Sequence, residues 1–222
     1  SNLKDLSQFN NDGAIFMGAQ RNIDNCKVSI LGVPYDGTSC FRPGSRFGPS
    51  AVREDSYGIE TYCPQLNLDL EDINFADLGS LEVPIGDARL TIEYVKDATA
   101  ILVKNNLKPL IIGGEHSITS GVIKAIINHY PDLIMIQLDA HADLRDEWLG
   151  NKFSHACTMK RCLEILPSKK IFQIGIRSGT KSEFIEMKNT KRLIPKVLGD
   201  NAEYLANALE GFNGTPIYLT FD

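Results

Sequence analysis

The stretch LIMIQLDAHADLR, residues 133–145, decides the fold, because a largely apolar run leads directly into two carboxylates and an imidazole. The apolar residues 133–138 predict a buried strand. Asp139, His141 and Asp143 alternate along the extended chain that follows, so their side chains would point to one face. Open α/β sheets bind their ligands at the carboxyl ends of the strands. The spacing therefore predicts a metal site there, and the simpler alternative is a solvated turn with an incidental histidine.

Two other segments have the same design. In PLIIGGEHS, residues 109–117, an apolar strand leads through two glycines to His116. In PIYLTFD, residues 216–222, an apolar strand ends on Asp222. We expect both side chains on the same rim of the sheet as Asp139, although a backbone carbonyl could equally satisfy His116.

The candidate ligand atoms of these segments are carboxylate oxygens and imidazole nitrogens, without a thiolate. Such a set suits a hard or borderline divalent ion. The candidate metal ligands are His116, Asp139, His141, Asp143 and Asp222. This set exceeds what one tetrahedral zinc requires, so two ions that share carboxylates fit better. Such a pair can activate water as a nucleophile. His155 follows in the segment 154–156 and is a candidate proton carrier, because an imidazole titrates near neutral pH; a surface-loop histidine is the alternative.

Strand and helix candidates alternate along the chain. This alternation predicts one α/β domain over residues 1–222, with a mainly parallel sheet covered by helices on both faces in three layers. The expected strands are 28–33, 73–77, 109–112, 133–138, 171–176 and 216–221. The expected helices are 49–57, 88–105, 118–129, 157–166, 182–189 and 200–210.

Composition excludes several classes of function. The 23 basic and 28 acidic residues give a net charge of −5 without a basic stripe, which argues against a nucleic-acid partner. No apolar run approaches the roughly 20 residues of a membrane span, so no membrane partner is expected. An odd number of cysteines, five at irregular spacing, predicts reduced thiols and a cytoplasmic location.

The motifs resemble the ureohydrolases, the family of arginase and agmatinase. The resemblance is carried by GGEHS at 113–117, DAHAD at 139–143 and TFD at 220–222, in the family's order, and by GVPYDGT at 32–38. It implies an arginase-like fold and two manganese ions. It also implies a homo-oligomer, either a trimer or a hexamer.

The resemblance assigns the ligands individually. It implies that His116 and Asp143 bind one ion, that His141 binds the other, and that Asp139 and Asp222 bridge them. The family's third signature continues with a further aspartate, and a later glutamate holds the guanidinium, both beyond Asp222. We therefore expect the 222 residues to be the truncated part of a longer protein.

The implied reaction is hydrolysis of a small cationic guanidino compound, with Asp143 or His155 delivering a proton to the departing amine. Residues after the metal run, including Arg145 and Asp146, resemble agmatinases, which favours agmatine hydrolysis to putrescine and urea in polyamine biosynthesis. Both residues are candidate substrate-binding groups, and a salt-bridged rim is the alternative. Guanidinobutyrase, formimidoylglutamase and arginase activities stay open. A non-catalytic binding or regulatory subunit stays open as well.

Overall fold

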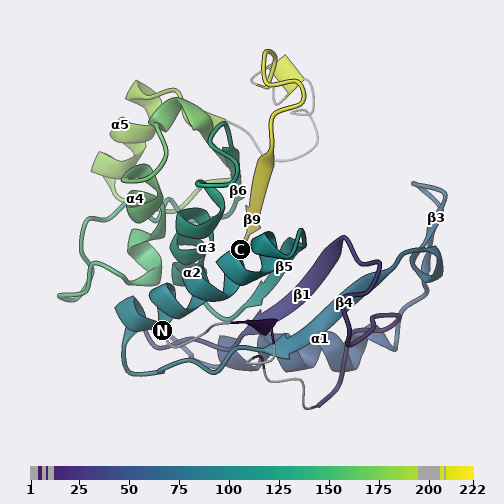
Figure 1. The fold of residues 1–222 in the computed structure, drawn as a ribbon. Coiled ribbons are helices and arrows are strands. Elements are labelled where there is room, and N and C mark those ends of the chain that lie inside the picture. The colour runs from purple at the N-terminus through teal and green to yellow at the C-terminus, as the bar shows by residue number, and fades with distance from the viewer. Residues whose placement is uncertain (1–4, 7–8, 10–12, 195–205, 208) are drawn as a thin grey trace. The chain divides into compact units, whose positions relative to one another are not determined.

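The computed structural model describes residues 5–6, 9, 13–194, 206–207 and 209–222. The chain forms two compact units, Ser1–Ala125 and Ile126–Asp222, whose elements are labelled in Figure 1. Each unit contains a parallel sheet whose strands alternate with helices along the chain. The α/β class and the mainly parallel pairing predicted from the sequence are confirmed.

The first unit is organised around a three-stranded sheet of order β4-β1-β5, with both pairings parallel. Its strands are β1 (Val28–Val33), β4 (Phe75–Ser80) and β5 (Lys108–Gly113). Its helices are α1 (Gly48–Ser56), α2 (Ala88–Lys104) and α3 (Thr119–Ile126). Helices α1 and α2 both pack against β5, so apolar residues of the sheet are covered.

Helix α2 shows why this part of the sequence is helical. Its N-cap is Asp87, whose carboxylate accepts a hydrogen bond from the backbone N–H of Leu90 at 2.9 Å. Ile92, Val95 and Leu102 recur at helical spacing and are almost fully buried. The helix therefore presents one apolar face to the core of the first unit.

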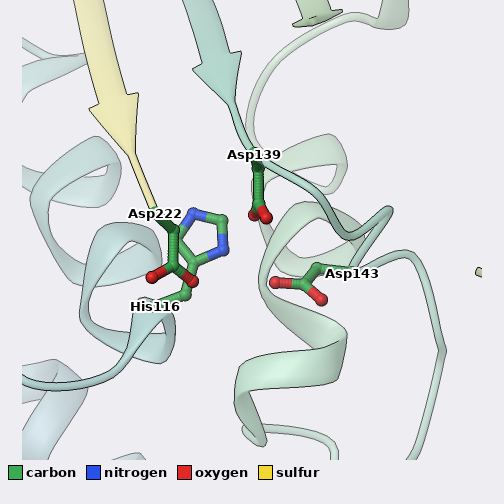
Figure 2. A group of neighbouring side chains, drawn as sticks. All are labelled: His116, Asp139, Asp143 and Asp222. Carbon is green, nitrogen blue, oxygen red and sulfur yellow. The ribbon is translucent and has the colours of Figure 1, made fainter. Parts of the chain in front are cut away.

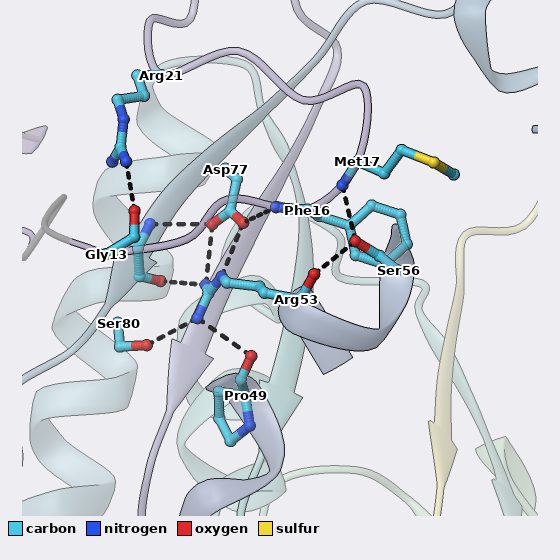
Figure 3. A network of polar contacts seen from close by, with 10 residues as sticks. Gly13, Phe16, Met17, Arg21, Pro49, Arg53, Ser56, Asp77 and Ser80 are labelled. Atoms are coloured by element: carbon cyan, nitrogen blue, oxygen red, sulfur yellow. Dashed lines mark hydrogen bonds and ion pairs between the residues drawn. The ribbon is translucent and has the colours of Figure 1, made fainter. Parts of the chain in front are cut away.

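A buried ion pair fastens α1 to β4 (Figure 3). The Arg53 guanidinium donates to both carboxylate oxygens of Asp77, at 2.8 and 2.9 Å, and neither residue is more than 3% exposed. It also donates to the backbone oxygen of Gly79 and to the hydroxyl of Ser80. The N–H of Phe16 donates to Asp77 at 2.8 Å, so the same carboxylate holds the chain before β1.

The second unit contains a four-stranded sheet of order β8-β7-β6-β9, again with every pairing parallel. Its strands are β6 (Ile134–Leu138), β7 (Ile171–Ile174), β8 (Leu193–Ile194) and β9 (Ile217–Phe221). Its helices are α4 (Thr158–Leu163) and α5 (Lys181–Asn189). Ile134, Ile136, Phe172 and Ile174 form the buried apolar cluster of this sheet.

Several details differ from the sequence expectation. The strand expected at 73–77 occupies Phe75–Ser80, because Asp77 can lie inside a strand once Arg53 neutralises it. A short antiparallel pair, β2 (Tyr62–Cys63) with β3 (Leu68–Asp69), was not predicted. The helix expected at 200–210 falls largely outside the described residues.

Two negative expectations concern residues that the structure describes. All five cysteines are described, and none of them forms a disulfide. Within the described segments, no helix has both the length and the apolar character that a membrane crossing requires.

Candidate metal centre

Strand register brings Asp139 and Asp222 together in the second unit. Strands β6 and β9 are parallel with Leu138 opposite Phe221, so the next residue of each strand is an aspartate at the same edge. The backbone N–H of Asp222 donates to the carbonyl of Leu138 at 3.0 Å, which continues the ladder to this point. Figure 2 shows both carboxylates where the two strands end.

Asp143 reaches the same place through an unusual backbone conformation. Its φ is +50°, a left-handed value that costs energy in a residue other than glycine. Its carbonyl accepts hydrogen bonds from the first N–H groups of α4, at Met159 (2.9 Å) and Lys160 (3.3 Å). The next N–H, of Leu144, donates to the buried carboxylate of Glu183 at 2.9 Å. Both polar groups of the peptide unit that follows Asp143 are therefore held in place.

The three carboxylates form a compact group. Each of Asp139, Asp143 and Asp222 offers one oxygen, and these oxygens lie within 4.8 Å of one another. Asp139 and Asp143 are buried, at 6% and 7% exposure. Like charges at this separation repel strongly away from water. A divalent cation would remove that repulsion, and an all-oxygen arrangement suits a hard or borderline ion.

His116 belongs to the first unit and is also drawn in Figure 2. It is the first residue of a short 3-10 helix, η4 (His116–Ile118), and is 6% exposed. The preceding carboxylate, Glu115, accepts hydrogen bonds from the backbone N–H of Thr38 (2.8 Å) and from the hydroxyls of Thr38 (2.5 Å) and Ser117 (2.6 Å). Gly114 is required here, because a Cβ would lie 1.8 Å from the carbonyl oxygen of Tyr35. The segment 33–38 thus fixes the turn that carries His116.

His141 and His155 are both in the second unit. The side chain of His141 is 62% exposed, and its Nδ1 lies 3.4 Å from Oδ1 of Asp139. His141 is not among the described residues whose ligand atoms lie within 4.8 Å of one another, so the structure does not bring this predicted ligand into the group. His155 begins the 3-10 helix η5 (His155–Cys157), with Nδ1 3.4 Å from the hydroxyl of Ser154. Burial raises the pKa of neighbouring Cys157 to about 11, so this thiol stays protonated at neutral pH and is a poor metal ligand.

Arg145 and Asp146 make contacts of different kinds. The Arg145 guanidinium lies over the Trp148 ring, 4.1 Å from its centroid. Asp146 accepts a hydrogen bond from Arg161 at 2.6 Å, which is the main reason that its pKa is lowered. The Asp146 carboxylate is therefore engaged by the protein itself, as in the salt-bridged rim considered from the sequence.

Sequence reasoning missed four side chains that support the candidate ligands. They are Glu115, Gln137, Gln173 and Glu183. A signal was present for the glutamines, because IMIQL and IFQI each place one amide inside an otherwise apolar strand. Thr180 and Glu183 fit the capping-box pattern that begins a helix, but nothing in the sequence indicated the contact of Glu183 with Leu144, 39 residues away.

Comparisons with known proteins agree with this geometry. The family model described as "Arginase family" matches residues 26–222. An agmatinase of Bacillus subtilis is 36% identical over 210 residues, which cover 95% of this chain and 72% of the relative. A human mitochondrial guanidino acid hydrolase is 28% identical over 212 residues, 91% of this chain and 60% of the relative. The crystal structure of the agmatine ureohydrolase of Thermoplasma volcanium matches with a TM-score of 0.82 and 29% identity, and covers 95% of this chain and 71% of that one.

Proposed function

The chain belongs to the arginase family, and we propose that it is an amidinohydrolase that converts agmatine and water into putrescine and urea. The resemblance to ureohydrolases and the arginase-like fold are confirmed by the family match and by the structural similarity. The observation that carries the proposal is the group of three aspartate carboxylates in the second unit, two at strand ends and Asp143 in the loop after β6. Hydrolysis of a guanidinium needs activated water, and this group can hold the cations that activate it.

We propose that the ligand set is the one implied by the sequence, with two Mn²⁺ ions. Asp139 and Asp222 would bind both ions. Asp143 and His116 would be the further ligands of one ion, and His141 would be a further ligand of the other. Carboxylates with imidazole are suitable ligands for manganese. The position of the His141 imidazole beside Asp139 supports this assignment.

The bound ions would supply a lowered pKa of water and stabilisation of the negative charge that develops on the reacting centre. When water adds to the guanidinium carbon, one C–N bond must break and the departing amine must gain a proton. Asp143 and His155 are the candidate groups for moving that proton. His155 suits the role because an imidazole exchanges protons near neutral pH.

We propose agmatine as substrate on two grounds. The family relatives described as agmatinases reach 36% identity over 95% of this chain. In addition, the segment from Arg145 to His155 resembles agmatinases. A guanidino acid is the second candidate, favoured by Arg145, whose guanidinium could bind a substrate carboxylate.

Urea release from the manganese-loaded protein tests the proposal. We would compare agmatine, arginine and guanidinobutyrate by urea release, and formiminoglutamate by formamide release, all at equal concentration. Agmatine should give the highest kcat/KM. A preference for a carboxylate-bearing compound would reject the agmatinase assignment, whereas no hydrolysis product from any of the four compounds would favour the non-catalytic alternative.

We also propose that both units belong to one ureohydrolase domain in a cytoplasmic homo-oligomer. The family model supports the single domain, because its match at residues 26–222 includes parts of both units. Size-exclusion chromatography with light scattering would test the trimer and hexamer expected from the resemblance. A monomer would contradict the homo-oligomer.

A further inference from the structure

Two glutamines lie side by side inside the sheet of the second unit. Gln137 on β6 is opposite Gln173 on β7 in the parallel register, and both are 0% exposed. Burying a side-chain amide is unfavourable unless its polar atoms find partners. Three of the four side-chain polar atoms of the two glutamines have partners in the described part of the chain, and Oε1 of Gln173 has none, so the pair calls for an explanation beyond packing.

The two amides are hydrogen-bonded in series. Nε2 of Gln173 donates to Oε1 of Gln137 at 2.7 Å and to the carbonyl of Ala142 at 3.1 Å. Nε2 of Gln137 donates to Oδ2 of Asp139 at 2.7 Å and to the carbonyl of His141 at 3.1 Å. The series therefore runs from Gln173 through Gln137 to a carboxylate of the candidate metal centre.

The acceptors determine which way each amide points. A carboxylate oxygen and a carbonyl oxygen face Gln137 on one side, so only its NH₂ group can lie there. Its oxygen must then face Gln173, which in turn must present its own NH₂ group. Hydrogen bonds in such a chain polarise one another, so the donor that reaches Asp139 is stronger than an isolated amide.

This arrangement fixes Asp139 from two directions. Gln137 holds Oδ2, while the backbone N–H of His141 donates to Oδ1 at 2.8 Å. The same two amides hold the carbonyls of residues 141 and 142, immediately before the left-handed Asp143. The relay thus acts on the Asp139 carboxylate and on the backbone that delivers Asp143.

We propose that Gln137 and Gln173 form an amide relay that positions Asp139 for metal binding, with Gln173 acting through Gln137. The proposal rests on the proposed function, because it takes Asp139 as a metal ligand. Both glutamines are positioning residues and touch neither metal nor substrate. Groups that orient metal ligands in this way typically contribute 10–100-fold to metal affinity.

The test measures Mn²⁺ affinity of the full chain by isothermal titration, in wild type, Gln137→Met, Gln173→Met and the double variant. Methionine keeps the length and the apolar fit and removes the amide. We expect Gln137→Met to weaken Mn²⁺ binding about 10–100-fold and Gln173→Met to weaken it less. The double variant should lose less affinity than the product of the two single losses, because Gln173 acts on Asp139 through Gln137 and reaches the backbone directly only at the carbonyl of Ala142. Losses that multiply in the double variant would overturn the serial relay.

Thr99→Val is the matched control. Thr99 is also 0% exposed, lies on α2 in the other unit, and its hydroxyl has no hydrogen-bond partner in the described part of the chain. This variant should bind Mn²⁺ like wild type. If the glutamine variants also bind like wild type, the relay is refuted even when wild type releases urea.

A spectroscopic readout separates positioning from general stability. In the metal-free protein, Gln173→Met should shift the side-chain amide NMR signals of Gln137, because their hydrogen-bonded neighbour is lost. Unchanged signals would overturn the relay independently of any activity or metal measurement. Should Gln137→Met fail to fold, Gln137→Leu also removes the amide donor and keeps an apolar side chain at this buried position. Normal Mn²⁺ affinity in that folded variant would refute the proposal.

Measurements on the wild-type protein also separate the proposed hydrolase activity from the amide relay. Mn²⁺ binding without urea release would contradict the proposed hydrolase and leave the relay test intact. A wild type that binds no Mn²⁺ would overturn both.

Discussion

Replacing Glu183 with Gln should weaken both the fold and the metal centre. Glu183 is 5% exposed, and its two carboxylate oxygens serve two backbone donors. Oε1 accepts from the N–H of Leu144 at 2.9 Å, and Oε2 accepts from the N–H of Thr180 at 2.6 Å. The first contact holds the residue after Asp143, and the second completes the capping box of α5.

The size of the expected destabilisation follows from the number of hydrogen-bond acceptors that remain in Glu183→Gln. A glutamine has one side-chain oxygen, so one of the two buried N–H groups would face an NH₂ group without an acceptor. An unsatisfied buried donor costs about 1–3 kcal/mol, which we expect as a loss in the free energy of unfolding of the metal-free protein. When Leu144 loses its acceptor, the left-handed Asp143 is less restrained, and Mn²⁺ affinity should fall about tenfold.

Thr180→Ala is the control for this prediction. It removes the hydroxyl that accepts from the N–H of Glu183 at 3.3 Å and leaves the Leu144 contact in place. The loss of a cap costs about 1 kcal/mol, so urea unfolding should report destabilisation by both variants. Mn²⁺ titration should report weaker binding for Glu183→Gln alone. Equal Mn²⁺ affinity in the two variants would refute the argument that Glu183 supports Asp143.

Three further predictions concern the centre and the first unit. Mn²⁺ should raise the unfolding temperature of the protein, because a ligand bound only by the folded state stabilises that state. Asp139→Asn should remove most of this temperature shift. An unchanged shift in the variant would exclude Asp139 as a metal ligand. His155→Asn should lower kcat by about 10²–10⁴-fold and leave the manganese content intact, because the variant loses the proton-transferring imidazole. Steady-state kinetics and metal analysis would check this. A raised KM with an unchanged kcat would contradict proton transfer by His155. Arg53→Met should reduce the free energy of unfolding, measured in urea, by about 3–5 kcal/mol, because the buried carboxyl group of Asp77 loses its cationic partner. The double variant Arg53→Met with Asp77→Leu should recover part of this loss. A loss under about 1 kcal/mol in Arg53→Met would contradict the ion pair's role.

The proposed centre illustrates how strain and burial are concentrated near reactive groups. Asp143 adopts a left-handed conformation and is 7% exposed, and both features are unfavourable for an aspartate by itself. Hydrogen bonds from α4 and to Glu183 hold the peptide unit that follows Asp143. Such a residue is fixed before a cation arrives, which reduces the ordering that metal binding would otherwise require.

The sequence by itself was enough for the class of fold and for most of the candidate ligands. Apolar runs that end on Asp139 and Asp222 predicted strands that deliver carboxylates, and the parallel register of β6 and β9 brings those two residues together. Local patterns carry this information, because strand periodicity and a run of apolar residues depend only on neighbouring positions. The motif order likewise sufficed for the family resemblance.

Only the tertiary structure decided how the ligands are supported. Gln137 and Gln173 are 36 residues apart in the sequence, and their hydrogen bond joins β6 to β7. Arg53 makes a charged residue acceptable inside β4, and Glu183 holds a backbone N–H from a distant helix. A buried polar group is stable only with a partner, and which distant residues become partners depends on strand order and register. Those are properties of the folded chain, and no local pattern in the sequence encodes them.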